Sequence, residues 1–188
     1  MIVIMSQNLS ACFDGLPFQR RRFDKGTALF LRGDPVKRMF MIVKGRVCLT
    51  RCAVDGRMIS LQRAQEREIV AEASLYADAY HCDGIAGAAT EVKSFARSAI
   101  RRHLRNDKRF FDAWAAHLSR EVQAARLRAE ILALKTVAAK LDAWLTFHDN
   151  ILPAKGGWKM LASEIGVSPE ALYRELAGRA FNRRPSLG

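Results

Sequence analysis

The sequence predicts an α+β fold in which a β-barrel of the jelly-roll type precedes one long helix and two short helices. Three observations lead to this prediction. Short apolar runs separated by turn residues fill the chain from Lys25 to about Ser98. Good helix formers without Gly or Pro then extend from Phe110 to Lys140. Finally, the segment Leu161–Leu176 has the residue spacing of two helices that cross closely.

The predicted barrel covers residues 1–105. Its apolar runs are Thr27–Leu31, Met39–Val43, Arg46–Thr50 and Met58–Leu61. Turn signals separate these runs, and Asp55-Gly56 between two of them predicts a tight hairpin, because Gly accepts positive φ angles. Strands of this length with turns at such spacing are typical of a sandwich or barrel.

The predicted long helix covers residues 106–136. Along it Leu118, Val122, Ala125, Ala129 and Leu132 step by four and three residues, which is the spacing of a coiled-coil seam. Charged residues flank the seam, so the pattern favours self-association through this face. The alternative is a helix that packs only on its own domain.

The third segment, residues 137–188, contains the two short helices, predicted at about Trp158–Ile165 and Pro169–Gly178. Small Ala162 allows close crossing, Gly166 can adopt the positive φ of the turn, and Leu172 closes the apolar core. Ser168 is the expected N-cap of the second helix, and Pro169 suits its first position.

The exposed start of the second helix has the residue types that read DNA bases. Arg174 can donate to guanine O6 and N7, and Glu170 can accept from cytosine N4. The alternative is an ordinary helical hairpin in which these two side chains pair at i,i+4. Lys and Arg number 31 against 19 Asp and Glu, and the net charge of +12 indicates a polyanion as partner, with nucleic acid preferred to an anionic membrane surface. The predicted contacts to double-stranded DNA are Ser168, Pro169, Glu170, Ala171, Tyr173, Arg174 and Arg179.

In this order, the segments resemble the CRP/FNR family of bacterial transcription regulators. The resemblance is carried by Gly26–Asp34, Met39–Val47, Ala71–Tyr76 and Leu161–Arg174. It implies a cyclic-nucleotide-binding-like barrel that acts as a sensor, a homodimer on a two-fold symmetric DNA site, and RNA polymerase as a candidate partner. By position, Glu170 and Arg174 match the base-contacting Glu and Arg of the family.

The barrel departs from the family where the effector binds. Members that bind cyclic nucleotides carry an Arg-Ser or Arg-Thr pair in their phosphate cassette, whereas this chain has Cys82 and Asp83. Cys has no positive charge and Asp repels phosphate, so we expect no binding of cyclic AMP. The resemblance places the effector pocket at Glu72, Ser74, His81, Cys82 and Asp83.

The C-terminal segment departs from the family twice. Pro169 stands where relatives often carry an Arg, so the operator should differ from theirs. The chain stops soon after the second helix, which leaves little room for a β-hairpin wing. Arg179, Arg183 and Arg184 are the expected phosphate contacts in its place.

The input to the barrel stays open at this level. His81 and Cys82 are candidate ligands for a metal or a thiol-redox switch, although a buried Cys82 with an ordinary His81 is the preferred interpretation. Cys48 and Cys52 are four residues apart on a predicted strand, about 13 Å at strand rise, which argues against an iron–sulfur cluster. The sequence does not identify a cofactor.

Other classes of protein fit less well. The chain lacks a Gly-rich phosphate loop, a nucleophile elbow and a His-Glu-x-x-His signature, so we expect no enzyme. A cupin-like barrel enzyme with a helical appendage would need several His inside the barrel, and this segment contains only His81. An RNA-binding module would need exposed aromatic residues, whereas the three Trp look like core residues. No apolar run is long enough to span a membrane, and we expect a cytoplasmic protein.

Overall fold

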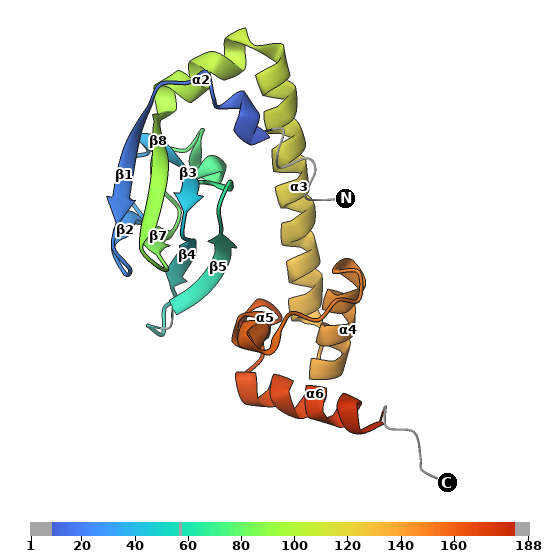
Figure 1. The fold of residues 1–188 in the computed structure, drawn as a ribbon. Helices are drawn as coiled ribbons and strands as arrows, with labels where there is room; N and C mark the ends of the chain where they lie inside the picture. The colour runs from blue at the N-terminus through green and yellow to red at the C-terminus, as the bar shows by residue number, and fades with distance from the viewer. Residues whose placement is uncertain (1–8, 57, 183–188) are drawn as a thin grey trace. The chain divides into compact units, whose positions relative to one another are not determined.

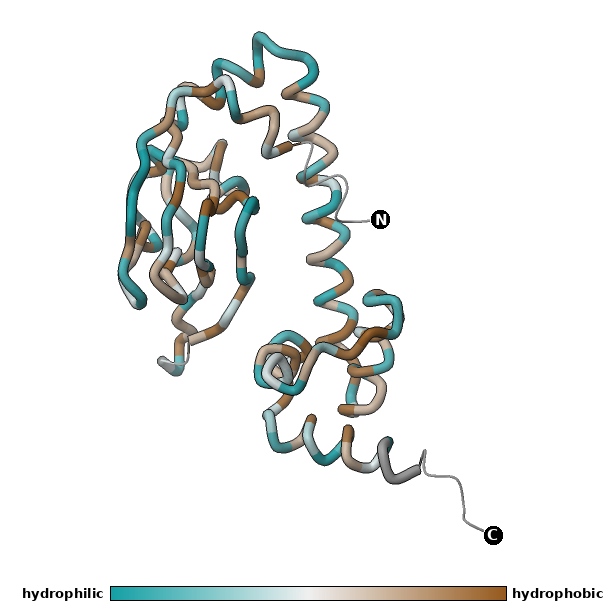
Figure 2. The backbone as a smooth tube through the Cα atoms, in the orientation of Figure 1, coloured by the Kyte–Doolittle hydropathy of each residue, from teal (hydrophilic) through white to brown (hydrophobic). Residues whose placement is uncertain are grey.

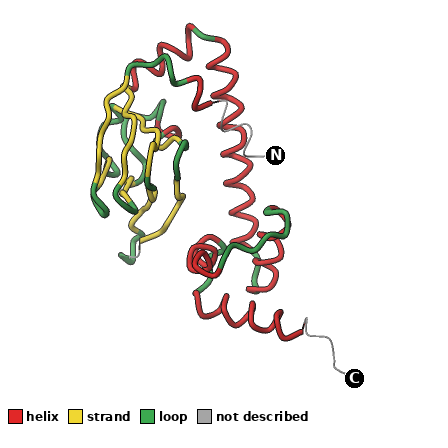
Figure 3. Tube along the Cα trace, viewed as in Figure 1, coloured by secondary structure: helices red, strands yellow, loops and turns green. Residues whose placement is uncertain are grey.

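The computed structural model describes residues 9–56 and 58–182 and divides into two compact units, Met1–Leu118 and Ser119–Gly188 (Figure 1). Figure 3 shows all strands in the first unit and only helices and loops in the second. No helix in the described ranges is long and apolar enough to cross a bilayer. We describe each unit separately below.

The first unit is a jelly roll of two four-stranded antiparallel sheets, as predicted. One sheet has the order β1-β8-β3-β6 and the other the order β2-β7-β4-β5. The strands are β1 (Phe18–Phe23), β2 (Ala28–Phe30), β3 (Arg38–Lys44), β4 (Val47–Cys52), β5 (Met58–Ala64), β6 (Ile69–Val70), β7 (Asp83–Ala86) and β8 (Thr90–Ala96). The hairpin predicted at Asp55-Gly56 joins β4 to β5, and Gly56 has a φ of +80°.

Strand β3 explains how the barrel and its outer layer are built. Phe40 and Ile42 point into the core between the sheets, whereas Met39 and Met41 belong to a second core on the outer side. Four consecutive buried residues are therefore compatible with a period of two, because both faces of the strand are covered.

The second core is formed by helical segments that cover the outer face of β3 and β8. Helix α2 (Arg97–Asn106) contributes Ile100 and Leu104, and helix α3 (Lys108–Ala133) contributes Phe110 and Trp114. The ring of Phe13 packs edge-on against Phe95 of β8 at 4.9 Å. The helices that follow the last strand therefore begin at Arg97, inside the range that the sequence assigned to the barrel.

The second unit is helical and has a core of its own. It contains the end of α3, α4 (Val137–Phe147), α5 (Trp158–Glu164) and α6 (Pro169–Asn182), with a 3₁₀ turn at Lys155–Gly157. Thr136 caps α4, since its side chain accepts a hydrogen bond from the Ala139 N–H at 3.1 Å. The core is formed by Ile131, Leu141, Trp144, Leu161, Ala162, Ile165 and Leu172.

Candidate nucleic-acid interface

Helices α5 and α6 form the helix pair predicted from the sequence. In Figure 1, α5 is seen nearly end-on whereas α6 runs across the view. Gly166, in the connecting turn, has a φ of +67°, and a Cβ there would collide with the Leu132 side chain. The Val167 N–H then closes the turn on the Ala162 carbonyl at 2.9 Å. The turn therefore needs Gly for both its conformation and its close packing.

The start of α6 is fixed by the expected cap. The Ser168 hydroxyl accepts a hydrogen bond from the Ala171 N–H at 3.2 Å, and Pro169 occupies the first helical position. Glu170 lies in the first turn, where the helix dipole favours a negative charge. Ser168 is thus engaged in capping, and in the structure its side chain orients the helix.

The base-reading candidates lie on the exposed side of the first two turns of α6. Glu170 and Arg174 are exposed, Tyr173 is 37% exposed, and Ala171 is half-buried. Among the described residues, neither Glu170 nor Arg174 forms an ion pair or side-chain hydrogen bond, so the i,i+4 pairing considered as an alternative is absent there. Tyr173 packs against Trp158 with ring centroids 5.8 Å apart.

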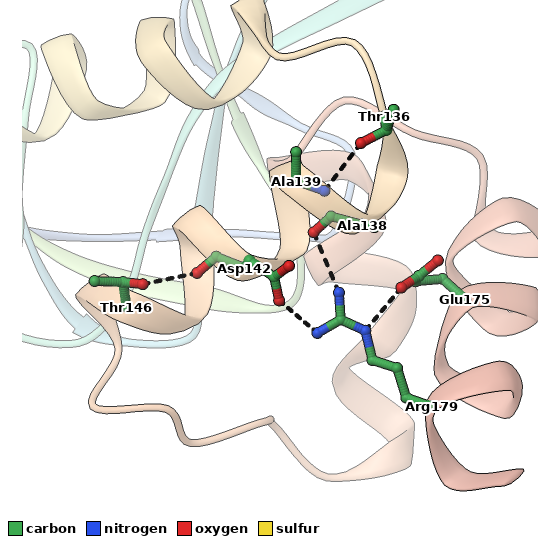
Figure 4. A network of polar contacts seen from close by, with 7 residues as sticks. All are labelled: Thr136, Ala138, Ala139, Asp142, Thr146, Glu175 and Arg179. Carbon is green, nitrogen blue, oxygen red and sulfur yellow. Dashed lines mark hydrogen bonds and ion pairs between the residues drawn. The ribbon is translucent and has the colours of Figure 1, made fainter. Parts of the chain in front are cut away.

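Arg179, a predicted DNA contact, has hydrogen-bond partners within the protein. Its guanidinium donates to the Glu175 carboxylate at 2.7 Å, to the Asp142 carboxylate at 2.6 Å and to the Ala138 carbonyl at 3.2 Å (Figure 4). Hydrogen bonds to these carboxylates raise the pKa of Arg179. The structure uses this side chain within the protein, and sequence analysis missed its partner Asp142. Arg183 and Arg184 lie outside the described residues.

The predicted coiled-coil seam is largely exposed on α3. Hydrophilic and hydrophobic positions alternate along this helix in Figure 2. Val122 and Leu132 are 49% and 50% exposed, and Ala125 and Ala129 are also exposed. Leu118 differs, because it packs against the second core of the first unit. The seam available to a partner helix therefore starts at Val122.

The predicted effector residues of the barrel, called the cassette below, include a short 3₁₀ turn at Glu72–Ser74. Its members are Glu72, Ser74, His81, Cys82 and Asp83. Glu72, Ser74 and Cys82 are buried, with relative exposures of 6%, 1% and 2%. The Ser74 hydroxyl is 3.1 Å from His81 Nδ1. The preceding residue, Ala71, has a φ of +76°, which costs a residue with a Cβ roughly 1–3 kcal/mol. The backbone is therefore strained directly before the 3₁₀ turn that carries Glu72 and Ser74.

Asp83 and Arg51 complete the cassette. The Asp83 carboxylate accepts a hydrogen bond from the Arg32 N–H at 2.7 Å. Arg51 of β4 donates to the His81 carbonyl at 2.8 Å and is a cation that sequence analysis missed. Burial, assisted by Arg51, lowers the pKa of His81. Pairing between strands β4 and β7 brings Arg51 next to the cassette, and no local sequence motif predicts this contact.

The described residues do not complete the candidate metal site at His81 and Cys82. Within residues 9–56 and 58–182, no group of three His, Cys, Asp or Glu side chains could hold a metal ion. His81 and Cys82 therefore have no third ligand among the described residues. Burial raises the pKa of Cys82 to about 11, against the opposing effect of Arg51. Cysteine binds metals as a thiolate, and the raised pKa keeps the Cys82 thiol protonated at neutral pH.

The comparisons with known proteins agree with this architecture. Residues 20–107 match the family model of the cyclic nucleotide-binding domain. A 60-residue stretch is 35% identical to the global nitrogen regulator of Synechococcus elongatus; it spans 32% of this chain and 27% of that protein, so the match covers about a quarter of the relative.

Two solved structures share the fold over most of the chain. FixK2 from Bradyrhizobium japonicum superposes with a TM-score of 0.71 at 17% identity, covering 89% of this chain and 86% of FixK2. A transcriptional regulator of the CRP family from Thermus thermophilus gives 0.61 at 19% identity, covering 86% and 85%. The Synechococcus and Thermus proteins are both described as regulators. The chain thus has the fold of FixK2 and of this CRP-family regulator, and its residues 20–107 are similar to a cyclic nucleotide-binding domain.

Proposed function

We propose that the protein is a sequence-specific, DNA-binding transcription regulator of the CRP/FNR type. The observation that carries the proposal is the first two turns of α6, which present Glu170 and Arg174 exposed and unpaired among the described residues. An exposed helix start with an unpaired guanidinium and carboxylate matches the donor and acceptor pattern of the major groove. The contact set is Ser168, Pro169, Glu170, Ala171, Tyr173 and Arg174, without Arg179.

The proposed regulator acts as a homodimer on a palindromic operator in the cytoplasm, with RNA polymerase as a further partner. Support comes from the exposed stripe of Val122, Ala125, Ala129 and Leu132 on α3. Small residues in such a stripe allow two helices to approach closely. A two-fold pair would present two copies of α6, and its half-sites would lie about one DNA turn, roughly 34 Å, apart.

The barrel is proposed to sense an input other than cyclic AMP. At the two cassette positions that should hold a phosphate, Cys82 is a buried thiol and Asp83 a carboxylate. Neither offers the positive charge that a cyclic phosphate needs. A thiol-redox input through Cys82 is disfavoured, since burial keeps this group in its unreactive protonated form.

Replacing Arg174 with Ala tests the base contact. A duplex selected from a randomised pool provides the operator, and affinity is measured on it and on a random duplex. We expect specific binding to weaken by about 1–3 kcal/mol, because one bidentate contact is lost, with a much smaller change on the random duplex. The control is Arg105→Ala, which removes an exposed Arg from the first unit. Equal losses on both duplexes would reject the base-contact role.

Placing a charge in the seam tests the dimer. In Ala125→Glu, two carboxylates would face each other across the proposed interface, and such like-charge contacts cost on the order of several kcal/mol. Sedimentation should show the dimer dissociating. The matched control is Gln123→Glu, which places the same charge on another side of α3 and should leave the dimer intact. Dissociation in both variants, or in neither, would contradict this interface.

Titration with cyclic AMP tests the sensor proposal. Calorimetry at physiological nucleotide concentrations should detect no saturable heat, and the affinity for the selected operator should not change when the nucleotide is added. The physical reason is the missing cation at Cys82 and Asp83. Stoichiometric binding with a change in operator affinity would refute this part of the proposal.

Alkylation of the cysteines tests the state of Cys82. With a pKa of about 11, roughly one Cys82 in a thousand is a thiolate at pH 8, so labelling should be very slow and should accelerate as the pH approaches 11. Exposed Cys52 provides the internal control and should be labelled readily. Peptide mapping by mass spectrometry reads out both sites, and denatured protein should label at Cys82 too. Similar labelling rates of Cys52 and Cys82 in the folded protein at pH 8 would contradict the protonated state of Cys82 and would support a thiol-redox input through it.

A further inference from the structure

We infer that Arg179 is a positioning residue, which holds the second half of α6 against α4 and so sets the direction in which α6 presents its first two turns. This inference rests on the proposed function, because the direction of α6 matters only if the helix reads DNA. It replaces the phosphate contact expected from the sequence.

The geometry of the contact is that of a clamp. Three nitrogens of one guanidinium reach three acceptors, and two of these, the Asp142 carboxylate at 2.6 Å and the Ala138 carbonyl at 3.2 Å, belong to α4 (Figure 4). The third, the Glu175 carboxylate at 2.7 Å, lies one turn earlier on α6 and holds the side chain in place. The planar, five-donor fork of Arg suits such a set of acceptors, whereas a Lys ammonium is a point donor on a flexible stem.

Among the described side chains of α6, packing into the apolar core ends at Leu176. The fully buried residue of the helix is Leu172, and Leu176 is partly buried against the same core. Ala177 and Gly178 are exposed. Beyond Leu176, Arg179 is the described side chain of α6 that contacts another element of the unit. Without it, the described anchors of α6 would be Leu172, Leu176 and the contact of Tyr173 with Trp158, and the helix could tilt about this part of its length.

The expected tilt is large enough to matter for base reading. Glu170 lies two residues before Leu172, roughly 3 Å along the helix axis, and six residues before Leu176, roughly 9 Å. A tilt of about 10° about this anchored stretch displaces Glu170 by roughly 0.5 to 1.5 Å. Hydrogen bonds tolerate only a few tenths of an ångström around their preferred length, so bidentate contacts to bases would be lost.

The clamp contributes to direction more than to stability. The side chains of Arg179 and Asp142 are 31% and 63% exposed, and ion pairs this exposed add little to the free energy of unfolding. A phosphate contact by Arg179 would also require breaking two short charged hydrogen bonds. Measurements can therefore distinguish three roles of Arg179: a contribution to the free energy of unfolding, a charged contact to phosphate, and the positioning of α6.

The test compares four variants in the full-length protein: Arg179→Met, Arg179→Lys, Asp142→Asn and Glu175→Gln. Affinity is measured on the selected operator and on random duplex over a range of salt, with the thermal midpoint as a control for folding. The Met, Lys and Asn variants should bind the operator about 5- to 20-fold more weakly, a loss comparable to that of a single base contact. Their affinity for random duplex, their salt slope and their midpoint should stay close to wild type.

Two further comparisons isolate the clamp. Glu175→Gln keeps both bonds to α4, so its operator affinity should fall less than about threefold. The double variant Asp142→Asn with Arg179→Met should be no weaker than Arg179→Met alone, because both changes break the same contact.

The outcomes that overturn the inference are distinct. Equal losses on both duplexes with a shallower salt slope in Arg179→Met, together with wild-type behaviour of Asp142→Asn, would make Arg179 a phosphate contact. Wild-type operator affinity of Arg179→Lys would overturn the clamp, because it would show that a positive charge at this position is enough and that the guanidinium geometry is not needed. If all four variants bind the operator with wild-type affinity, and the wild type discriminates between the duplexes, the clamp is overturned and the proposed function is not. A wild type that does not discriminate between duplexes would overturn both.

Discussion

One small apolar core positions every element of the candidate DNA-reading unit. It joins Ile131 of α3, Leu141 and Trp144 of α4, Leu161 of α5 and Leu172 of α6. Small units bury a limited fraction of their surface and have little stability to spare. Such a core can hold helices together without fixing all their angles. The polar contacts at its edge, the caps of Thr136 and Ser168 and the Arg179 network, supply the remaining constraints.

The barrel is constrained differently, because its sheets are covered on the inside and partly on the outside. Phe30 stacks on Tyr80 at 4.2 Å and on Phe40 at 5.8 Å, and its ring occupies the space that a Cβ at position 84 would need. The interior beside the cassette is therefore filled by the protein's own aromatic rings, because Tyr80 and Gly84 directly flank His81–Asp83. Arg51 also lies at the cassette, where its guanidinium donates to the His81 carbonyl.

Much of the fold could be predicted from local patterns. The strands around the Asp55-Gly56 hairpin, the jelly-roll class, α5, the Gly166 turn and the Ser168 cap were all expected. Strand β1 was not, since Phe18–Phe23 holds three consecutive arginines at a sheet edge, and an exposed edge strand needs no apolar alternation. The early start of α2 was missed because the strand pattern was extended to Ser98.

The functional residues show where sequence reasoning stops. Glu170 and Arg174 could be placed because they lie within one helix, where spacing alone determines the face. The intramolecular role of Arg179 was missed because its partner Asp142 is 37 residues away. Arg51 was missed for the same reason, since the His81 carbonyl is 30 residues along the chain. Contacts between elements decide these roles, and a single sequence does not show which elements meet.

Helix α3 runs without interruption from Lys108 to Ala133, and the boundary between the two units falls inside it, after Leu118. It has no Gly or Pro, and its 26 residues span about 39 Å. Its last turn carries Ile131 into the core of the second unit. Helical bonding is interrupted at residues 134–136, immediately before α4, and Thr136 caps that next helix. Because Ile131 and Leu141, on either side of this break, share one core, an insertion or deletion at residues 134–136 should disturb the packing of the whole second unit.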